Sequence, residues 1–117
     1  MIGNDCICRL QNIYKAINNF EIEMQKATGL NLNEAMTLCL LNSGRGELMS
    51  GEIADRLSLT RSNASKVIAI LEEERLIRRH VCSQDSRCQK FSITKKGRDK
   101  LQETCEKLTI PEELKEL

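Results

Sequence analysis

The residues best suited to chemistry lie close together at the start of one predicted helix. Thr60 is a good N-cap for a helix that runs to about Arg75, because its hydroxyl can accept a hydrogen bond from the first turn. Asparagine can bind adenine, and Lys or Arg can bind guanine, through base edges in the major groove of DNA. We therefore predict major-groove contacts by the side chains that crowd the first half of this helix: Arg61, Ser62, Asn63, Ser65 and Lys66.

A shorter helix precedes this cluster and is expected to position it. Ser50 is a predicted N-cap, and Ile53, Ala54 and Leu57 share one face of the helix that follows. The longer helix has its own apolar face, formed by Ala64, Val67, Ile68 and Leu71. Two such helices joined by a short turn indicate a helix-turn-helix, which inserts its second helix into the major groove. Similar helix pairs also occur in domains that bind only proteins, and this alternative stays open.

A β-hairpin is predicted directly after the second helix. Residues 78–82 and 89–93 contain β-branched or aromatic residues and are separated by the polar segment 83–87. In this position a hairpin is a wing, and Arg87 near its tip is expected to enter the narrow minor groove, where the negative potential is strongest. Asp85 can hold that guanidinium by a charge-assisted hydrogen bond. The alternative for both residues is a solvated turn pair that contributes almost nothing.

The net charge of +1 conceals a basic middle section. Residues 56–100 carry twelve Lys or Arg against five Asp or Glu, whereas residues 1–55 and 101–117 each have a net charge of −3. A basic section confined to the predicted DNA-contacting region is typical of phosphate binding. For any single cation, a solvated surface charge is the alternative. The expected phosphate contacts are Arg56, Arg78, Arg79, Lys90, Lys95, Lys96 and Arg98.

Four sequence blocks occur in an order that is far more specific than any one of them. They are LSLTRSNASK (57–66), LEEERLIRR (71–79), DSR (85–87) and ITKKG (93–97). Together they resemble the MarR family of winged helix-turn-helix transcriptional regulators, over about Leu32 to Leu101.

The resemblance implies a mainly α-helical fold with a small β-hairpin wing and flanking dimerisation helices. It also implies a homodimer that binds a pseudo-palindromic operator in double-stranded DNA, with Ser62, Asn63, Ser65 and Lys66 at the major groove and Arg87 in the minor groove. Such proteins are most often repressors, released by a small-molecule effector or by thiol oxidation. This chain departs from the family pattern where Cys88 follows Arg87, and a shorter C-terminal dimerisation helix is expected.

The first helix is expected to help form the dimer. Apolar residues recur every three or four positions over about residues 5–28, which gives this helix one apolar seam. Asn4 or Asp5 is predicted to cap it, and Gly29 to end it. Residues 95–117 are expected to pair with it, so that the first and last helices of two chains intertwine.

The remaining helices are expected to act as scaffold. Asn33 is the predicted cap of a helix through Asn42, and Thr94 that of a helix to about Leu108. Pro111 suits the first turn of a short final helix ending at Leu117.

Cys6 and Cys8 are the candidate redox residues among the six cysteines. They lie at the start of the first helix, where the helix N-terminus can lower a thiol pKa and favour reaction with peroxide. Two residues apart, however, their side chains point in different directions.

The other cysteines are assigned less active roles. Cys39 and Cys105 lie on apolar stripes and are predicted to be buried. Cys82 and Cys88 flank the wing and could pair across it. With His80 they supply only three ligands, so we predict no metal site.

No paired nucleophile and base, phosphate-binding glycine loop or carboxylate pair stands out, so we predict neither an enzyme nor a cofactor. The chain lacks a bilayer-spanning apolar run and a secretion signal, so a cytoplasmic location with no membrane partner is expected. The favoured interpretation is a homodimeric DNA-binding regulator, one domain over residues 1–117 with its DNA-contacting region at about 50–97. The alternative is a winged-helix module that binds a protein and has no operator of its own.

Overall fold

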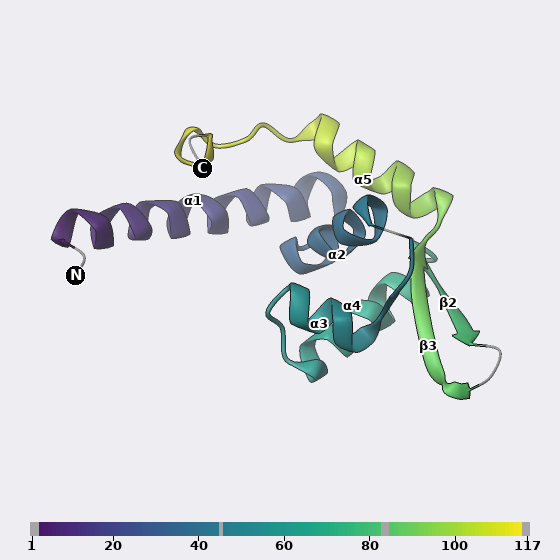
Figure 1. Ribbon diagram of the computed structural model, residues 1–117. Coiled ribbons are helices and arrows are strands. Elements are labelled where there is room, and N and C mark those ends of the chain that lie inside the picture. Colours follow the sequence, from purple (N-terminus) through teal and green to yellow (C-terminus); the bar gives the residue numbers. More distant parts are fainter. Residues whose placement is uncertain (1–2, 45, 83–84, 116–117) are drawn as a thin grey trace.

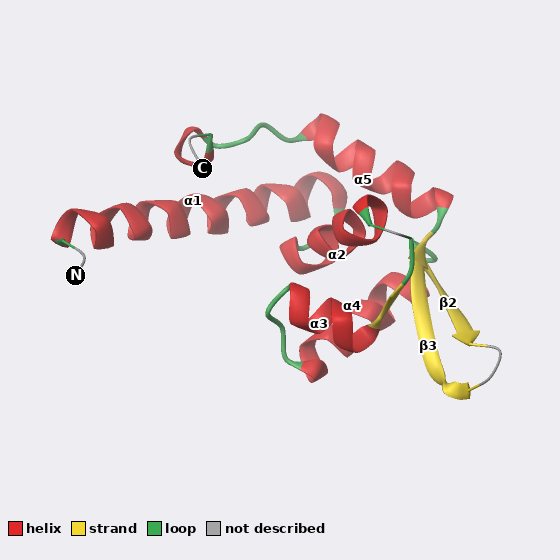
Figure 2. Ribbon diagram, in the orientation of Figure 1, coloured by secondary structure: helices red, strands yellow, loops and turns green. Residues whose placement is uncertain are grey.

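The computed structural model describes residues 3–44, 46–82 and 85–115. The described residues form five α-helices and a small three-stranded antiparallel sheet (Figures 1 and 2). The elements are α1 (Asn4–Thr28), α2 (Leu32–Ser43), β1 (Leu48–Met49), α3 (Ser50–Arg56), α4 (Arg61–Glu73), β2 (Ile77–Cys82), β3 (Asp85–Ile93), α5 (Lys95–Lys107) and the 3-10 turn η1 (Glu112–Leu114). The strand order is β1-β3-β2. The predicted class, mainly helical with a β-hairpin wing, is confirmed.

The predicted helix-turn-helix consists of α3 and α4. Thr60 caps α4 as predicted, because its Oγ1 accepts a hydrogen bond from the Asn63 N–H at 3.0 Å. The prediction for α3 was wrong by one residue: Met49 occupies the cap position and Ser50 is the first helical residue. Met49 donates its N–H to the Glu52 carboxylate at 3.0 Å, which satisfies the helix start without a hydroxyl cap.

The wing is longer than the sequence indicates. Cys82 pairs with Asp85 in the antiparallel register, so the second strand begins at Asp85 and the predicted turn 83–87 was too wide. β1 was not predicted; it is two residues long and pairs with β3 opposite Phe91 and Lys90. Its shortness explains the omission, since two residues show no alternation.

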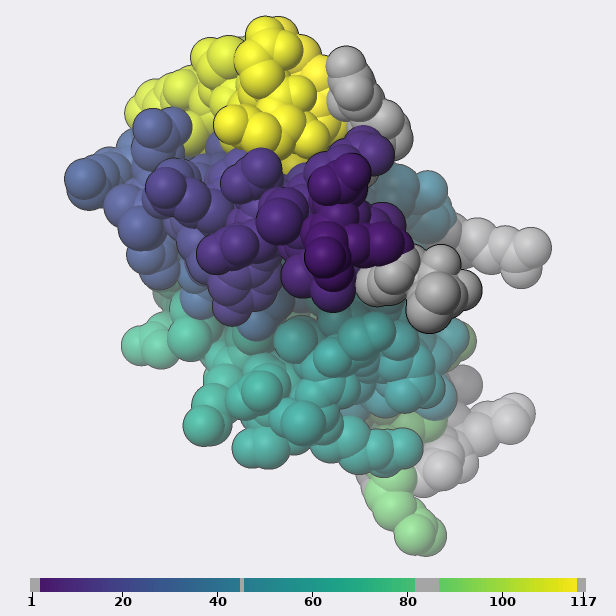
Figure 3. Space-filling model, turned by 90° about the vertical axis from the view of Figure 1, so that its left-hand side faces the viewer, coloured from purple at the N-terminus to yellow at the C-terminus, as the bar shows by residue number. Residues whose placement is uncertain are grey.

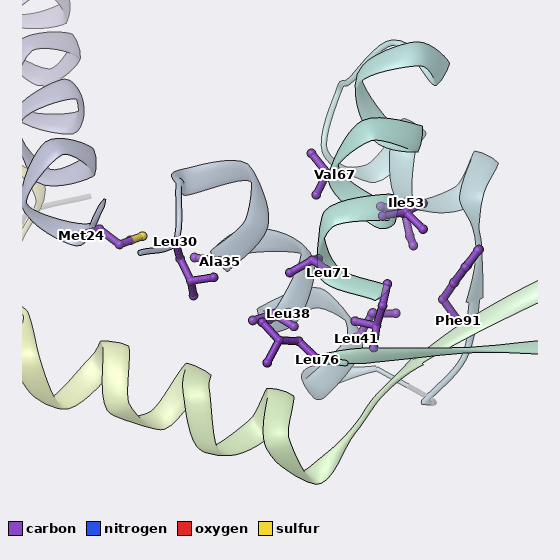
Figure 4. Close-up of a cluster of buried hydrophobic side chains, with 12 residues drawn as sticks. Met24, Leu30, Ala35, Leu38, Leu41, Ile53, Val67, Leu71, Leu76 and Phe91 are labelled. Atoms are coloured by element: carbon purple, nitrogen blue, oxygen red, sulfur yellow. The ribbon is translucent and has the colours of Figure 1, made fainter. Parts of the chain in front are cut away.

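The core joins both parts of the helix-turn-helix to α2 and the sheet (Figure 4). Its fully buried side chains include Leu38 and Leu41 of α2, Ile53 of α3 and Leu71 of α4. Phe91 of β3 closes the cluster on the sheet side. Burial of these apolar surfaces fixes α4 against the body of the molecule, so that only its other face meets solvent.

The start of α5 packs very closely against the turn between α4 and β2. Thr94 caps α5 as predicted, accepting the Gly97 N–H at 3.0 Å. A Cβ on Gly97 would lie 2.1 Å from the Leu76 carbonyl oxygen, so only glycine fits there. The basic α5 start is thereby held beside the base of the wing.

Both N-terminal helices begin differently from the predictions. Gly3, rather than Asn4 or Asp5, occupies the α1 cap position, while Gly29 ends the helix in a left-handed conformation (φ 80°) as predicted. Asn31, not Asn33, caps α2. It forms a reciprocal pair with Glu34, with N···O distances of 2.8 and 3.0 Å, which outcompetes a cap two residues later.

The C-terminal segment runs back along α1 (Figure 1). The described part contains the short turn η1 in place of a final helix, with Pro111 in its cap position, whereas the predicted end at Leu117 lies outside the described residues. None of the described helices combines the length and the apolar character needed to cross a membrane.

Candidate nucleic-acid interface

The polar cluster predicted on α4 lies on its solvent-facing side. Ala64 and Val67 are buried, which fixes the direction in which the cluster points. Across the described part of the chain, no ion pair or side-chain hydrogen bond involves the cluster side chains. Their polar groups are therefore available to a ligand. The exposed residues are Arg61, Ser62, Asn63, Ser65 and Lys66.

The start of α3 extends this polar surface. A hollow of about 220 Å³ is lined by Ser50 and Gly51 of α3 and by Arg61 and Ser65 of α4. Figure 3 shows α3 and α4 together on the face opposite the C-terminal segment, with the wing projecting beyond them. In a winged helix, the helix in the position of α4 enters the major groove.

Arg87 lies near the outer end of this wing. It is exposed on β3, two residues from the strand start at Asp85. The side chain of Asp85 lies outside the described residues, so the expected Asp85–Arg87 bond stays a prediction. Arg87 thus lies toward the outer end of the wing, and its contact with a minor groove stays a prediction.

The predicted phosphate contacts lie on several surfaces. Arg56 ends α3, and Lys95 begins α5; both are exposed. Arg78 and Lys90 lie on the sheet face turned away from α4, because side chains alternate along a strand and Arg79 contacts α4. Lys90 and Arg98 line a hollow of about 620 Å³ where α2, β3 and α5 meet.

Two of the predicted phosphate contacts bind other parts of the protein. The Lys96 ammonium donates to the Glu74 carbonyl oxygen at 3.0 Å, at the end of α4. Arg79 forms an ion pair with Glu72, with an Nη2···Oε1 distance of 2.6 Å, and also donates to Gln89. The sequence patterns did not predict Glu72 and Gln89 as partners of Arg79. The partners lie on different elements, so no local spacing reveals the contacts.

The cysteines are placed differently from some of the predictions. Cys6 and Cys8 are exposed free thiols at the start of α1. Cys39 and Cys105 are exposed as well, so the prediction that they are buried was wrong. Each follows a buried residue, Leu38 or Thr104, and a helix turns by 100° per residue.

The wing carries two more cysteines, Cys82 and Cys88. Cys88 is disulfide-bonded; the side chain of Cys82 lies outside the described residues. Over the ranges that the structure describes, no group of three or more His, Cys, Asp or Glu could hold a metal ion.

Known proteins resemble this chain in sequence and in fold. The HTH-type transcriptional regulator PapX of Escherichia coli is 32% identical over 86 residues, covering 73% of this chain and 52% of that protein. The chain therefore spans about half the length of this relative. BldR, a transcriptional regulator from Sulfolobus solfataricus, is 28% identical with a TM-score of 0.74, covering 91% of this chain and 78% of BldR.

A third similarity concerns the fold alone. Sco3205, a MarR family transcriptional regulator from Streptomyces coelicolor solved in complex with DNA, has a TM-score of 0.74 at 23% identity, covering 92% of this chain and 70% of Sco3205. The model of the MarR family matches residues 28–87, which include α2, the helix-turn-helix and the first part of the wing. The chain belongs to the MarR family of winged helix-turn-helix transcriptional regulators.

Proposed function

We propose that this chain is a homodimeric transcriptional regulator, most plainly a repressor, that binds double-stranded DNA in a sequence-specific manner. The observation that carries the proposal is the exposed polar cluster on α4, whose side chains form no hydrogen bond or ion pair with other side chains within the described residues. In a winged helix, this is the part that meets the major groove. The similarity to PapX, an HTH-type transcriptional regulator, supports the same function.

Base recognition is assigned to the first half of α4. Asn63 and Lys66 have the groups to bind adenine and guanine, while Ser62 and Ser65 can bind either. Arg61 reaches bases or phosphates from the first turn. Arg87 is assigned to the minor groove, where a narrow A·T-rich segment attracts a guanidinium. Asp85 is assigned to holding that guanidinium.

Phosphate contacts are assigned to cations on α3, on the start of α5 and on the sheet face turned away from α4. Arg56, Arg78, Lys90 and Lys95 are the candidates whose charged groups form no ion pair within the described residues. Such contacts fix the register on DNA without recognising sequence. Arg79 and Lys96 are set apart, because Arg79 already binds Glu72 of α4 and Gln89 of β3, and Lys96 donates to the Glu74 carbonyl oxygen at the end of α4.

Dimer formation is assigned to α1 and the C-terminal segment. Ile7, Leu10 and Tyr14 lie on one face of α1 and are 55%, 57% and 70% exposed. Ile110 of the C-terminal segment is 51% exposed. An apolar stripe of this kind on a projecting helix is typical of an interface (Figure 1). A second copy of the chain would cover it.

A signal would act by changing the spacing of the two α4 helices in the dimer. It needs only to favour, over the DNA-binding form, a form of the dimer whose α4 helices no longer match successive major grooves. The hollow lined by Lys90 and Arg98 can hold a small-molecule effector, and the exposed Cys6 and Cys8 can supply thiol oxidation. If oxidation is the signal, peroxide releases DNA from the parent but not from the Cys6→Ser/Cys8→Ser variant. Equal release from both would remove these thiols from the mechanism.

Binding to DNA is tested by selecting fragments from a random duplex pool and titrating the selected duplex over a range of salt concentrations. Four phosphate contacts per protomer in a dimer predict a slope of log K against log salt of about −7. Failure to enrich any sequence, with no salt dependence, would favour a module that binds a protein through the same face of α4.

A further inference from the structure

Arg79 lies between the recognition helix α4 and the wing. It belongs to β2 and stands opposite Phe91 of β3 in the register. Its guanidinium lies over the Phe91 ring, 5.3 Å from the ring centroid. Since Phe91 is buried in the core, Arg79 occupies the sheet face that turns toward α4.

The guanidinium of Arg79 is bonded to both neighbouring elements. Its Nε and Nη2 donate to the two carboxylate oxygens of Glu72 on α4, at 3.2 and 2.6 Å. Its Nη1 donates to Gln89 Oε1 on β3 at 2.9 Å. A two-point bond between a planar guanidinium and a carboxylate fixes orientation as well as distance. Arg79 therefore ties the helix to both strands of the wing.

Two further bonds secure the end of α4. The Thr94 hydroxyl donates to the Arg75 carbonyl oxygen at 2.7 Å, and the Lys96 ammonium donates to the Glu74 carbonyl oxygen at 3.0 Å. These bonds hold the helix end to the segment after β3. Of the three side chains Arg79, Thr94 and Lys96, only Arg79 also bonds within the described part of the wing, to Gln89 on β3.

We propose that Arg79 is a positioning residue, which sets the direction of the wing relative to α4 and so couples the major-groove and minor-groove contacts. This inference rests on the proposed binding to duplex DNA. A protein that contacts both grooves of one duplex needs its two contacting parts at a fixed separation. Within the described residues, the wing joins the body near its base, where β1 pairs with Phe91 and Lys90 and Arg79 binds α4, so a bond there controls where Arg87 lies.

A phosphate contact by Arg79 would have different consequences. Loss of such a contact weakens binding to every duplex and lowers the salt slope by about 0.9. In that case neutralising Glu72 strengthens binding, because it frees the cation and removes a negative charge near DNA. If Arg79 is a positioning residue, substituting either Arg79 or Glu72 breaks the same bond, so both substitutions weaken the preference for the selected duplex and neither changes the salt slope.

The experiment measures the affinity of four variants for the selected duplex and for a scrambled duplex of equal length, over a range of salt concentrations. Arg79→Gln and Glu72→Gln break the pair from either side. Arg78→Gln removes the adjacent cation on the other sheet face, and Glu73→Gln removes an equal charge one residue along α4 without breaking the pair. Circular dichroism confirms that each variant is folded at the temperature used.

The expected result is that Arg79→Gln and Glu72→Gln each reduce the preference for the selected duplex about tenfold, and that the double variant loses no more than either alone. Their affinity for the scrambled duplex and their salt slopes stay at the parent values. Arg78→Gln lowers the slope by about 0.9 on both duplexes. Glu73→Gln leaves the preference unchanged.

Two results would overturn the inference, and they are distinguishable. A lower salt slope for Arg79→Gln together with tighter binding by Glu72→Gln would make Arg79 a phosphate contact while leaving the proposed function intact. A parent protein that binds no duplex at any salt concentration would remove the proposed function, and this inference with it.

Discussion

At the scale of single residues, exposure and bonding divide the cations of this chain into two kinds. Lys66 and Lys95 are exposed and form no ion pair within the described residues, whereas Arg79 and Lys96 bind α4. Charge counting along the sequence treats all four alike. The structure separates cations with no bond to the rest of the described protein from cations that already hold α4 in place, and we assign DNA contacts to the first kind.

A pair of lysine substitutions tests the assigned contacts. Lys66→Ala should reduce binding to the selected duplex about tenfold and relax the base preference at one position, since a base contact is lost. Lys95→Ala should weaken all duplexes alike and lower the salt slope by about 0.9. Binding titrations on single-base variants of the selected duplex give both values. If the two substitutions affect every sequence equally, the assignment of Lys66 to a base is wrong.

At the scale of the helices and strands, the caps control where the recognition helix begins. Thr60→Ala removes the hydroxyl that accepts the Asn63 N–H, and should lower the free energy of unfolding by about 1 kcal/mol. Ser50→Ala is the matched control, because Ser50 lies inside α3 and should change that free energy by less than about 0.5 kcal/mol. Urea unfolding measures both. A larger loss for Ser50→Ala would move the start of α3 back to the cap predicted from sequence.

Gly97 tests the contact between α5 and the turn that follows α4. Gly97→Ala places a methyl group 2.1 Å from the Leu76 carbonyl oxygen, so the free energy of unfolding should fall by about 2–3 kcal/mol. Gly51→Ala is the control, since an added Cβ there meets nothing within 4 Å. The same urea experiment compares them. Equal stabilities would contradict the close packing of α5.

Local signals in the sequence predicted much of the fold, and non-local bonds account for most of the rest. Thr60, Thr94 and Gly29 act within a few residues of themselves, so their roles were predictable. The cap of α2 is Asn31 and not the predicted Asn33, although Glu34 three residues after Asn31 is the local spacing of a capping box. The role of Arg79 depends on a helix and a strand meeting in space, which no spacing in the sequence shows.

At the scale of the whole molecule, the projecting half of α1 exposes apolar side chains that nothing in a single chain covers within the described residues. Its apolar face at Ile7, Leu10 and Tyr14 is open to solvent, while the same helix is buried at Met24. The helical seam was predictable from spacing, but which part of it packs inside the chain depends on where α2 and the C-terminal segment lie.

Dimerisation through this face can be tested by charge. Leu10→Glu combined with Tyr14→Glu should convert a dimer to a monomer, because two carboxylates would be buried without partners. Lys26→Glu, exposed on another face of α1, should leave the dimer intact. Sedimentation velocity distinguishes the two states. A parent protein that sediments as a monomer, or a double variant that stays dimeric, would exclude this interface.

The central claim is that the exposed face of α4 contacts base edges in the major groove. It is tested most directly by replacing purines of the selected duplex, one at a time, with their 7-deaza analogues, which lack the N7 acceptor but still pair normally. Parent affinity should fall about tenfold at one or more positions, and the Asn63→Ala/Lys66→Ala variant should lose no further affinity there. Unchanged parent affinity at every purine would contradict the account.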